Sequence, residues 1–164
     1  MSLPENSASR LRQLQVVVAA LAGGAALFLV VVLALPRPGD AGRADPFLVY
    51  LAIAATVGAV GARFALPGLL RTQGRRQLRA GKAIRGANDD ERLLAVYQGE
   101  VIVGAALLEG AALLCAVAYL LERSPIGVGL GFALVALMLF WEFPTRGRLE
   151  PWLEEQGKLL RAGD

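Results

Sequence analysis

Apolar residues gather in four long runs, each of the length that a helix needs to cross a lipid bilayer. The runs cover residues 16–35, 47–66, 101–121 and 125–141. A transmembrane helix takes about 20 predominantly apolar residues, with a range of about 17 to 25, so the fourth run is at the short end. Prolines in the two short connections stop a helix between the first and second runs and between the third and fourth. The pattern predicts an all-α fold, a bundle of four transmembrane helices in a single membrane domain, 1–164.

Two polar segments, 67–92 and 142–164, accompany the four runs. The first predicts a basic helical segment that ends before a third helix starting near Asp89, whose acidic residues suit a helix N-terminus. The second predicts a short amphipathic helix with Pro151 in its first turn. We expect this helix either to lie on the membrane surface or to pack on the ends of the spans. One of its faces would carry Trp152, Leu153, Gln156 and Leu160.

Composition supports a membrane protein and excludes some chemistry. The 164 residues are 55% hydrophobic, with a mean hydropathy of +0.52, and long apolar runs of this kind are typical of membrane proteins. There is no histidine, and Cys115 is the only cysteine. These counts exclude a disulfide within one chain and a Cys/His metal site. We therefore expect no metal and no cofactor.

The basic residues divide unevenly between the two sides of the predicted bundle. Fourteen Lys and Arg fall in the N-terminal tail, at Arg63, in segment 67–92 and in the C-terminal tail, against three on the opposite side. The positive-inside rule then places both termini in the cytoplasm. Fifteen of the seventeen basic residues are arginine, and alanine and glycine are abundant. This composition suggests a bacterial source, so we expect the bacterial cytoplasmic (inner) membrane.

Glu109 lies near the centre of the third run. An ionisable residue at such depth costs roughly 2.5–3.5 kcal/mol on insertion scales, which makes it a functional candidate. Helical spacing places small residues and Gln98 on the same face, so we expect Glu109 to point into a helix–helix contact. Two interpretations remain open. Glu109 is either a neutral acid hydrogen-bonded to a neighbouring helix or a group that carries a proton or cation.

Arg63, near the end of the second run, needs a counter-charge if it stays within the membrane margin. Glu100 should lie at a similar depth, and we expect an Arg63–Glu100 pair, with Glu109 as the second choice of partner. Without a partner, Arg63 would extend to the membrane interface.

A stripe of cations follows the second run at spacings of three and four residues. Such a stripe binds anionic lipid headgroups or a partner, or it is the ordinary topology signal of a cytoplasmic segment. No aromatic residues are interleaved with the cations, so nucleic-acid binding is not expected. The members of this basic stripe are Arg71, Arg75, Arg76, Arg79, Lys82 and Arg85.

Two resemblances accompany these patterns. The segments TVGAVGARFA and GAALLEGAALLCAVAYLL resemble the helical hairpin of the rotary ATP synthase c subunit, which implies an ion-binding role for Glu109. The loop between them is far longer here and lacks that family's Arg-Gln-Pro turn. The order of four spans, an LLEGAAL motif and a Pro144-Thr145-Arg146 tail is similar to small four-helix bacterial membrane proteins of unknown function. That second resemblance implies a fold and a location but no activity.

The sequence holds no Ser/His/Asp set, no phosphate-binding loop and no dinucleotide motif. We therefore expect a protein that is not an enzyme. The leading hypothesis is an accessory, assembly or structural component, which contacts the lipid bilayer and forms a homo-oligomer or part of a larger membrane complex. The alternative is a proton- or cation-coupled membrane protein that uses Glu109.

Overall fold

Five helices make up the computed structural model, which describes residues 5–36, 47–79 and 89–162. They are α1 (Glu5–Ala34), α2 (Phe47–Arg79), α3 (Asp89–Glu122), α4 (Pro125–Leu137), which continues into the π-helical turn η1 (Met138–Glu142), and α5 (Arg146–Ala162). The predicted all-α fold is confirmed, and so is the start of the third helix at Asp89. The prediction of Pro151 in the first turn of the last helix is wrong. The Thr145 carbonyl accepts hydrogen bonds from the amides of Arg148 and Leu149, so α5 begins about one turn earlier.

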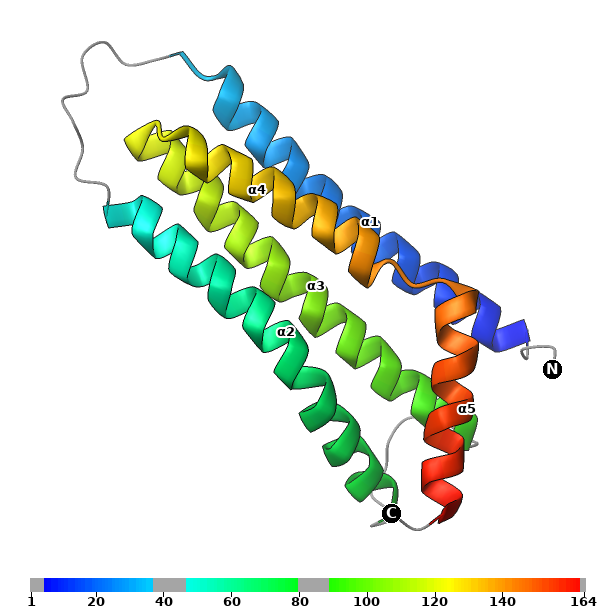
Figure 1. Cartoon of the computed structure of the whole chain (residues 1–164). Helices are drawn as coiled ribbons and strands as arrows, with labels where there is room; N and C mark the ends of the chain where they lie inside the picture. The colour runs from blue at the N-terminus through cyan, green and yellow to red at the C-terminus, as the bar shows by residue number, and fades with distance from the viewer. Residues whose placement is uncertain (1–4, 37–46, 80–88, 163–164) are drawn as a thin grey trace.

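Four of these helices are long and apolar enough to cross a membrane. The candidate spans are Ala8–Ala34, Phe47–Gly74, Glu91–Glu122 and Pro125–Glu142. Large apolar side chains stay exposed along the outer faces of α1 and α2, among them Leu27, Val57 and Phe64. Such faces are what lipid contact requires, and the chain is an integral membrane protein. The spans alternate in direction, so α2 ends and α3 begins at the end of the bundle where α5 lies (Figure 1).

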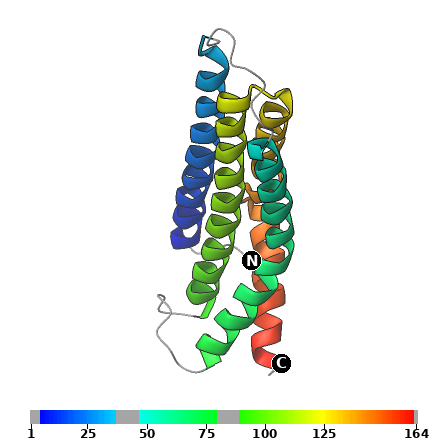
Figure 2. The same cartoon turned by 90° about the vertical axis from the view of Figure 1, so that its left-hand side faces the viewer.

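The third helix is the centre of the bundle. α3 packs against α1, α2 and α4, and half of the residues in its most apolar stretch are buried. Small side chains at these contacts, such as Ala105, Ala112 and Ala116, are fully buried. Small residues let neighbouring helix backbones approach closely, which is the main source of helix association in lipid. Figure 2 shows α3 running the length of the bundle between its neighbours.

Two glycines allow α4 to approach its neighbours closely. A Cβ on Gly127 would lie 2.8 Å from the carbonyl oxygen of Cys115, and a Cβ on Gly131 would lie 2.7 Å from a methyl group of Leu29. Both distances are shorter than a methyl group tolerates. Glycine at these positions therefore brings α4 onto α3 and α1.

The α3–α4 turn ties three helices together at the end opposite α5. Glu122, the last residue of α3, accepts hydrogen bonds from the amides of Leu48 and Val49, the latter at 2.9 Å. These amides belong to the first turn of α2 and have no partner within their own helix, so Glu122 caps α2. Arg123 follows with a φ of 54°, a left-handed conformation that closes a helix C-terminus. Its amide bonds the carbonyl of Tyr119 at 2.8 Å.

Pro67 divides α2 into two parts. Its ring removes an amide that would bond the Arg63 carbonyl and crowds that carbonyl, which bends a helix. Figure 2 shows the second half of α2 turning away from the line of its first half. Arg63 and Arg71 stand one turn before and one turn after Pro67.

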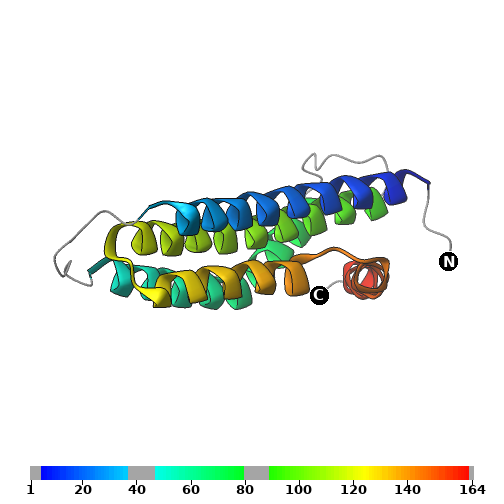
Figure 3. The ribbon, with the colours of Figure 1, turned by 90° about the horizontal axis from the view of Figure 1, so that it is seen from above.

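The last helix crosses the end of the bundle. In Figure 3, α5 is seen end-on while the four long helices run across the picture. Leu149, Trp152 and Gln156 are buried, and α5 contacts α3. Gln15 of α1 donates a hydrogen bond of 2.8 Å to the carbonyl of Pro144, which holds the linker before α5. The structure thus packs α5 on the ends of the spans, which is one of the two predicted positions.

Candidate functional site

A buried carboxylate inside the bundle, close to the α5 end, is the most unusual group of the structure. Glu142, at the end of η1, has a side chain that is 0% exposed, and one of its oxygens accepts a hydrogen bond from Nε of Arg63. Arg63 reaches it from α2, with 17% of its side chain exposed. A charge buried at this depth needs an opposite charge beside it. The pair joins the second and fourth spans.

Two local features place the Glu142 carboxylate against α3. Glu142 follows Leu134 and Met138 at intervals of four residues, so it lies on the same buried face of the helix, and the wider π-helical turn Met138–Glu142 ends the span there. On α3, Gly104 leaves room for the Glu142 carboxylate because it has no side chain. A Cβ at that position would lie 2.9 to 3.0 Å from the carboxylate atoms of Glu142. The other carboxylate oxygen, Oε2, has no hydrogen-bond partner among the described residues.

A second ion pair lies further toward the α5 end of the bundle than the Arg63–Glu142 pair. Glu100 of α3 is 5% exposed, and both of its oxygens accept from Arg71 of α2, at 3.0 Å from Nε and 2.8 Å from Nη2. This two-bond geometry is the strongest form of an arginine–carboxylate contact. The guanidinium of Arg71 also lies 5.9 Å from the ring centre of Trp152. Trp152 in turn meets Tyr97 edge-on, with ring centres 5.2 Å apart.

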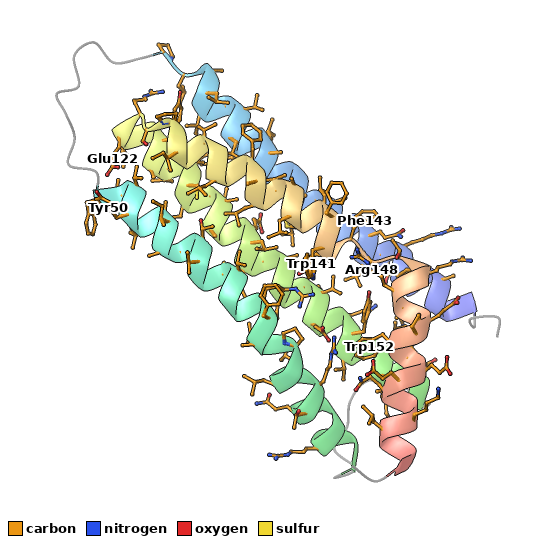
Figure 4. All side chains as sticks on the ribbon, viewed as in Figure 1. Tyr50, Glu122, Trp141, Phe143, Arg148 and Trp152 are labelled. Atoms are coloured by element: carbon orange, nitrogen blue, oxygen red, sulfur yellow. The ribbon has the colours of Figure 1, made fainter. Side chains whose placement is uncertain are left out.

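Arg148 of α5 joins the Arg63–Glu142 and Arg71–Glu100 pairs, and we call these five residues the charged cluster. Its two terminal nitrogens donate to the carbonyls of Trp141, at 2.6 Å, and Phe140, at 3.0 Å. The last carbonyls of a helix have no partner within the helix and carry partial negative charge, so a cation there is stabilising. Arg148 therefore fixes α5 to the end of η1. Figure 4 shows the labelled side chains of Trp141, Arg148 and Trp152 at the junction of these elements.

The charged cluster surrounds a cavity of about 330 Å³. This volume falls within the range of about 300 to 1,000 Å³ that is typical of small-molecule sites. Its walls come from α2 on one side and from η1 and α5 on the other, with α3 between them. The lining residues are Arg63, Arg71, Tyr97, Glu100, Val101, Trp141, Glu142, Arg148 and Trp152.

The structure pairs the predicted intramembrane charges differently from the sequence analysis. Arg63 contacts Glu142, not Glu100 or Glu109, and Glu100 contacts Arg71. The reason is geometric. Arg71 lies two turns further along α2 and faces Glu100, whereas Glu142 lies on the buried face of the fourth span and Gly104 leaves it room beside Arg63. Gln98 is partly exposed on α3, and within the described residues it makes no hydrogen bond to Glu109.

Glu109 is partly buried on α3, at its contact with α1. Its Oε1 lies 3.9 Å from where a Cβ of Gly24 would stand, so the glycine leaves room for the carboxyl group. In the part of the chain that the structure describes, no hydrogen bond or ion pair involves Glu109. It lies on α3 nine residues after Glu100, outside the cavity.

Only part of the basic stripe falls within the described structure. Arg71 lines the cavity and Arg76 is exposed. Arg75 and Arg79 belong to α2, but the placement of their side chains lies outside the described structure, as do Lys82 and Arg85 altogether. The first member of the stripe, Arg71, is engaged with Glu100.

Sequence reasoning missed Glu142, Arg148 and the aromatic wall of Tyr97 and Trp152. Glu142 directly follows the fourth apolar run, so hydropathy alone places it in the tail. One signal was available. Arg63 needed an acid at its own depth, and Trp141–Glu142 stands at the corresponding end of the fourth run. The sequence pattern contains no feature that predicts the π-helical turn.

Among residues 5–36, 47–79 and 89–162, no group of three or more His, Cys, Asp or Glu side chains is placed to hold a metal ion. Comparisons of the chain with protein-family models, with curated proteins and with solved structures give no match.

We predict that Arg63→Gln lowers the free energy of unfolding by about 3–5 kcal/mol, because it leaves the Glu142 carboxylate buried without its cation. The double variant Arg63→Gln/Glu142→Gln should recover most of this loss, since two amides hydrogen-bond without a buried charge. Equilibrium unfolding in mixed detergent micelles measures both. A double variant as unstable as Arg63→Gln alone would show that the ion pair does not act as described.

Proposed function

We propose that this integral membrane protein is not an enzyme and serves as an accessory, assembly or structural component that associates within the bilayer through the lipid-facing side of α2. The observation that carries the proposal is the small-residue surface of that helix. Ala54, Gly58, Gly61 and Ala65 are all exposed, at spacings of four, three and four residues. These spacings place them on one helical face, which we call the α2 face.

The α2 face is unusually open for a helix in the middle of the chain. Only 17% of the residues in the most apolar stretch of α2 are buried, against 50% for α3. No atom lies within 4 Å of a Cβ built on Gly58 or Gly61. Small residues at such spacing let another transmembrane helix pack backbone to backbone. A second copy of this chain or a helix of a larger complex would find that surface here.

The charged cluster supports a structural role for the α5 end. Both acids that line the cavity are engaged by arginines, and Arg148 is engaged by backbone carbonyls. These groups stabilise the junction of four elements. We place this end in the cytoplasm of a bacterial cell, with the protein in the cytoplasmic membrane, because fourteen of the seventeen basic residues fall on that side. Reporter fusions to the C-terminus test this orientation.

We predict that Gly58→Leu/Gly61→Leu weakens self-association at least about ten-fold, or about 1.4 kcal/mol, because the leucines hold neighbouring helices apart. The monomer should stay as stable as the wild type, since both positions face open space. Energy transfer between donor- and acceptor-fused copies in vesicles, measured across lipid-to-protein ratios, gives the dissociation constant.

The matched control is Gly23→Leu, which adds the same bulk at an exposed glycine of α1 with open space around it. It should leave association unchanged. If the wild type is monomeric at all ratios and also brings no other membrane protein with it on mild solubilisation, the proposed role is wrong.

A second candidate function rests on Glu109. Its carboxyl group lies within a span, beside Gly24, and has no partner among the described residues. An acid so placed is suited to carry a proton or cation, and the c-subunit resemblance supports that role.

We predict for this candidate that Glu109→Gln abolishes proton flux into dye-loaded vesicles while the fold, read by circular dichroism, stays intact. Glu150→Gln, which alters an exposed acid of α5, is the control. Equal flux for wild type, Glu109→Gln and protein-free vesicles would exclude ion coupling.

A further inference from the structure

The surface that the cavity offers to a ligand is cationic, although two acids line it. The carboxylates of Glu100 and Glu142 are 5% and 0% exposed, whereas their partners Arg71 and Arg63 are 32% and 17% exposed. An approaching molecule therefore meets the guanidinium edges and not the acids. With the exposed Arg148, three positive charges face two negative ones, so the walls keep one positive charge in excess.

A hydrogen-bond donor in the same wall has no acceptor. Nε1 of Trp152 is buried and has no partner among the described residues. A buried indole N–H usually finds an acceptor, and leaving it unpaired costs free energy. The same walls also hold one unpaired acceptor, Oε2 of Glu142, whose side chain has no exposed surface. The excess positive charge of the exposed guanidinium groups therefore decides the class of ligand, and it favours an anion rich in acceptor oxygens. Phosphate is such an anion, and among cationic side chains arginine is the one whose planar group best matches its oxygens.

The rim of the cavity identifies the source of the anion. Phe64 and Trp141 meet edge-on across α2 and η1, with ring centres 5.7 Å apart, and they are 67% and 50% exposed. Phe140, beside them, is 82% exposed. An exposed tryptophan at the end of a span, here Trp141, marks the depth of the lipid headgroups. The cavity therefore lies at that depth, with an apolar flank beside it.

We propose that the cavity is a binding site for the phosphate headgroup of an anionic phospholipid. The phosphate lies against Arg63, Arg71 and Arg148, and its acyl chains follow the exposed aromatic flank of Phe64 and Phe140. The headgroup oxygens supply the acceptor that Trp152 lacks. Basic pockets between transmembrane helices bind anionic headgroups by the same combination of charge and depth. This site is separate from the α2 face and from Glu109.

The two tryptophans of the chain, Trp141 and Trp152, both line the cavity, so intrinsic fluorescence reports its occupancy. The experiment titrates dioctanoyl phosphatidylglycerol into the full-length protein in a neutral detergent. One parallel arm uses dioctanoyl phosphatidylcholine, which has the same chains and no net charge. Another uses glycerol 3-phosphate, which has the phosphate without the chains. We expect saturable binding of phosphatidylglycerol, and binding at least about five-fold weaker for each of the other two.

Two variants locate the site. Arg148→Gln removes the excess charge and should raise the dissociation constant at least about five-fold. Arg146→Gln removes an exposed charge two residues away that does not line the cavity, and it should leave binding unchanged. Trp152→Phe keeps the ring against Tyr97 and deletes only the donor. Read through Trp141, it should weaken binding about ten-fold.

The fold of each variant is checked by circular dichroism, and Trp152→Phe keeps the test decisive if Arg148→Gln unfolds. Equal affinity for phosphatidylglycerol and phosphatidylcholine would overturn the proposal, and so would equal loss in the Arg148 and Arg146 variants. Glycerol 3-phosphate binding as tightly as the lipid would assign the cavity to a soluble phosphate compound and overturn the lipid source.

Discussion

The α5 end of this protein is organised around one buried ion pair. The Glu142 carboxylate has no exposed surface, so its charge is tolerated only because Arg63 stands beside it. That requirement fixes the relative position of α2 and η1. It also explains why α3 carries a glycine at position 104, since any larger residue would displace the carboxylate. Three spans thus meet at this one contact.

The rest of the α5 end follows from that contact. Arg148 donates hydrogen bonds to the last carbonyls of η1, and these bonds hold α5 across the end of the bundle. α5 then brings Trp152 against Tyr97 and over Arg71, and Arg71 engages Glu100. The cavity forms because α2 bends at Pro67 while η1 and α5 close the opposite side. A charged, aromatic pocket results, lined by three arginines and two buried acids.

The features that depend on hydropathy were predictable. The four spans, the all-α fold and the start of α3 at Asp89 follow from runs of apolar residues and from helix-end preferences, which are local properties. The pairing of charges was not predictable in the same way. Spacing along one helix says which residues share a face, but not how two helices rotate toward each other. Arg63 was matched to Glu100 by depth, and the structure shows that the choice among acids at one depth depends on helix rotation.

Glu142 shows a second limit of hydropathy. It stands eight residues after Leu134 and four after Met138, so it shares their buried face, but the apolar run ends just before it. The π-helical turn Met138–Glu142, which ends the span, carries no distinctive signal in the sequence. Gly104 carried no distinctive signal either, because glycine is common throughout the spans of this chain.

The contact of Glu142 with Gly104 holds η1 and α5 in place. Hydrogen–deuterium exchange of Gly104→Ala, compared with Gly110→Ala on the open side of the same helix, tests this contact. We expect faster exchange across Met138–Glu142 and Arg146–Ala162 in Gly104→Ala alone, with no change at the Glu122 cap of α2 at the far end. Unchanged exchange in η1 and α5, or the same increase in both variants, would contradict it.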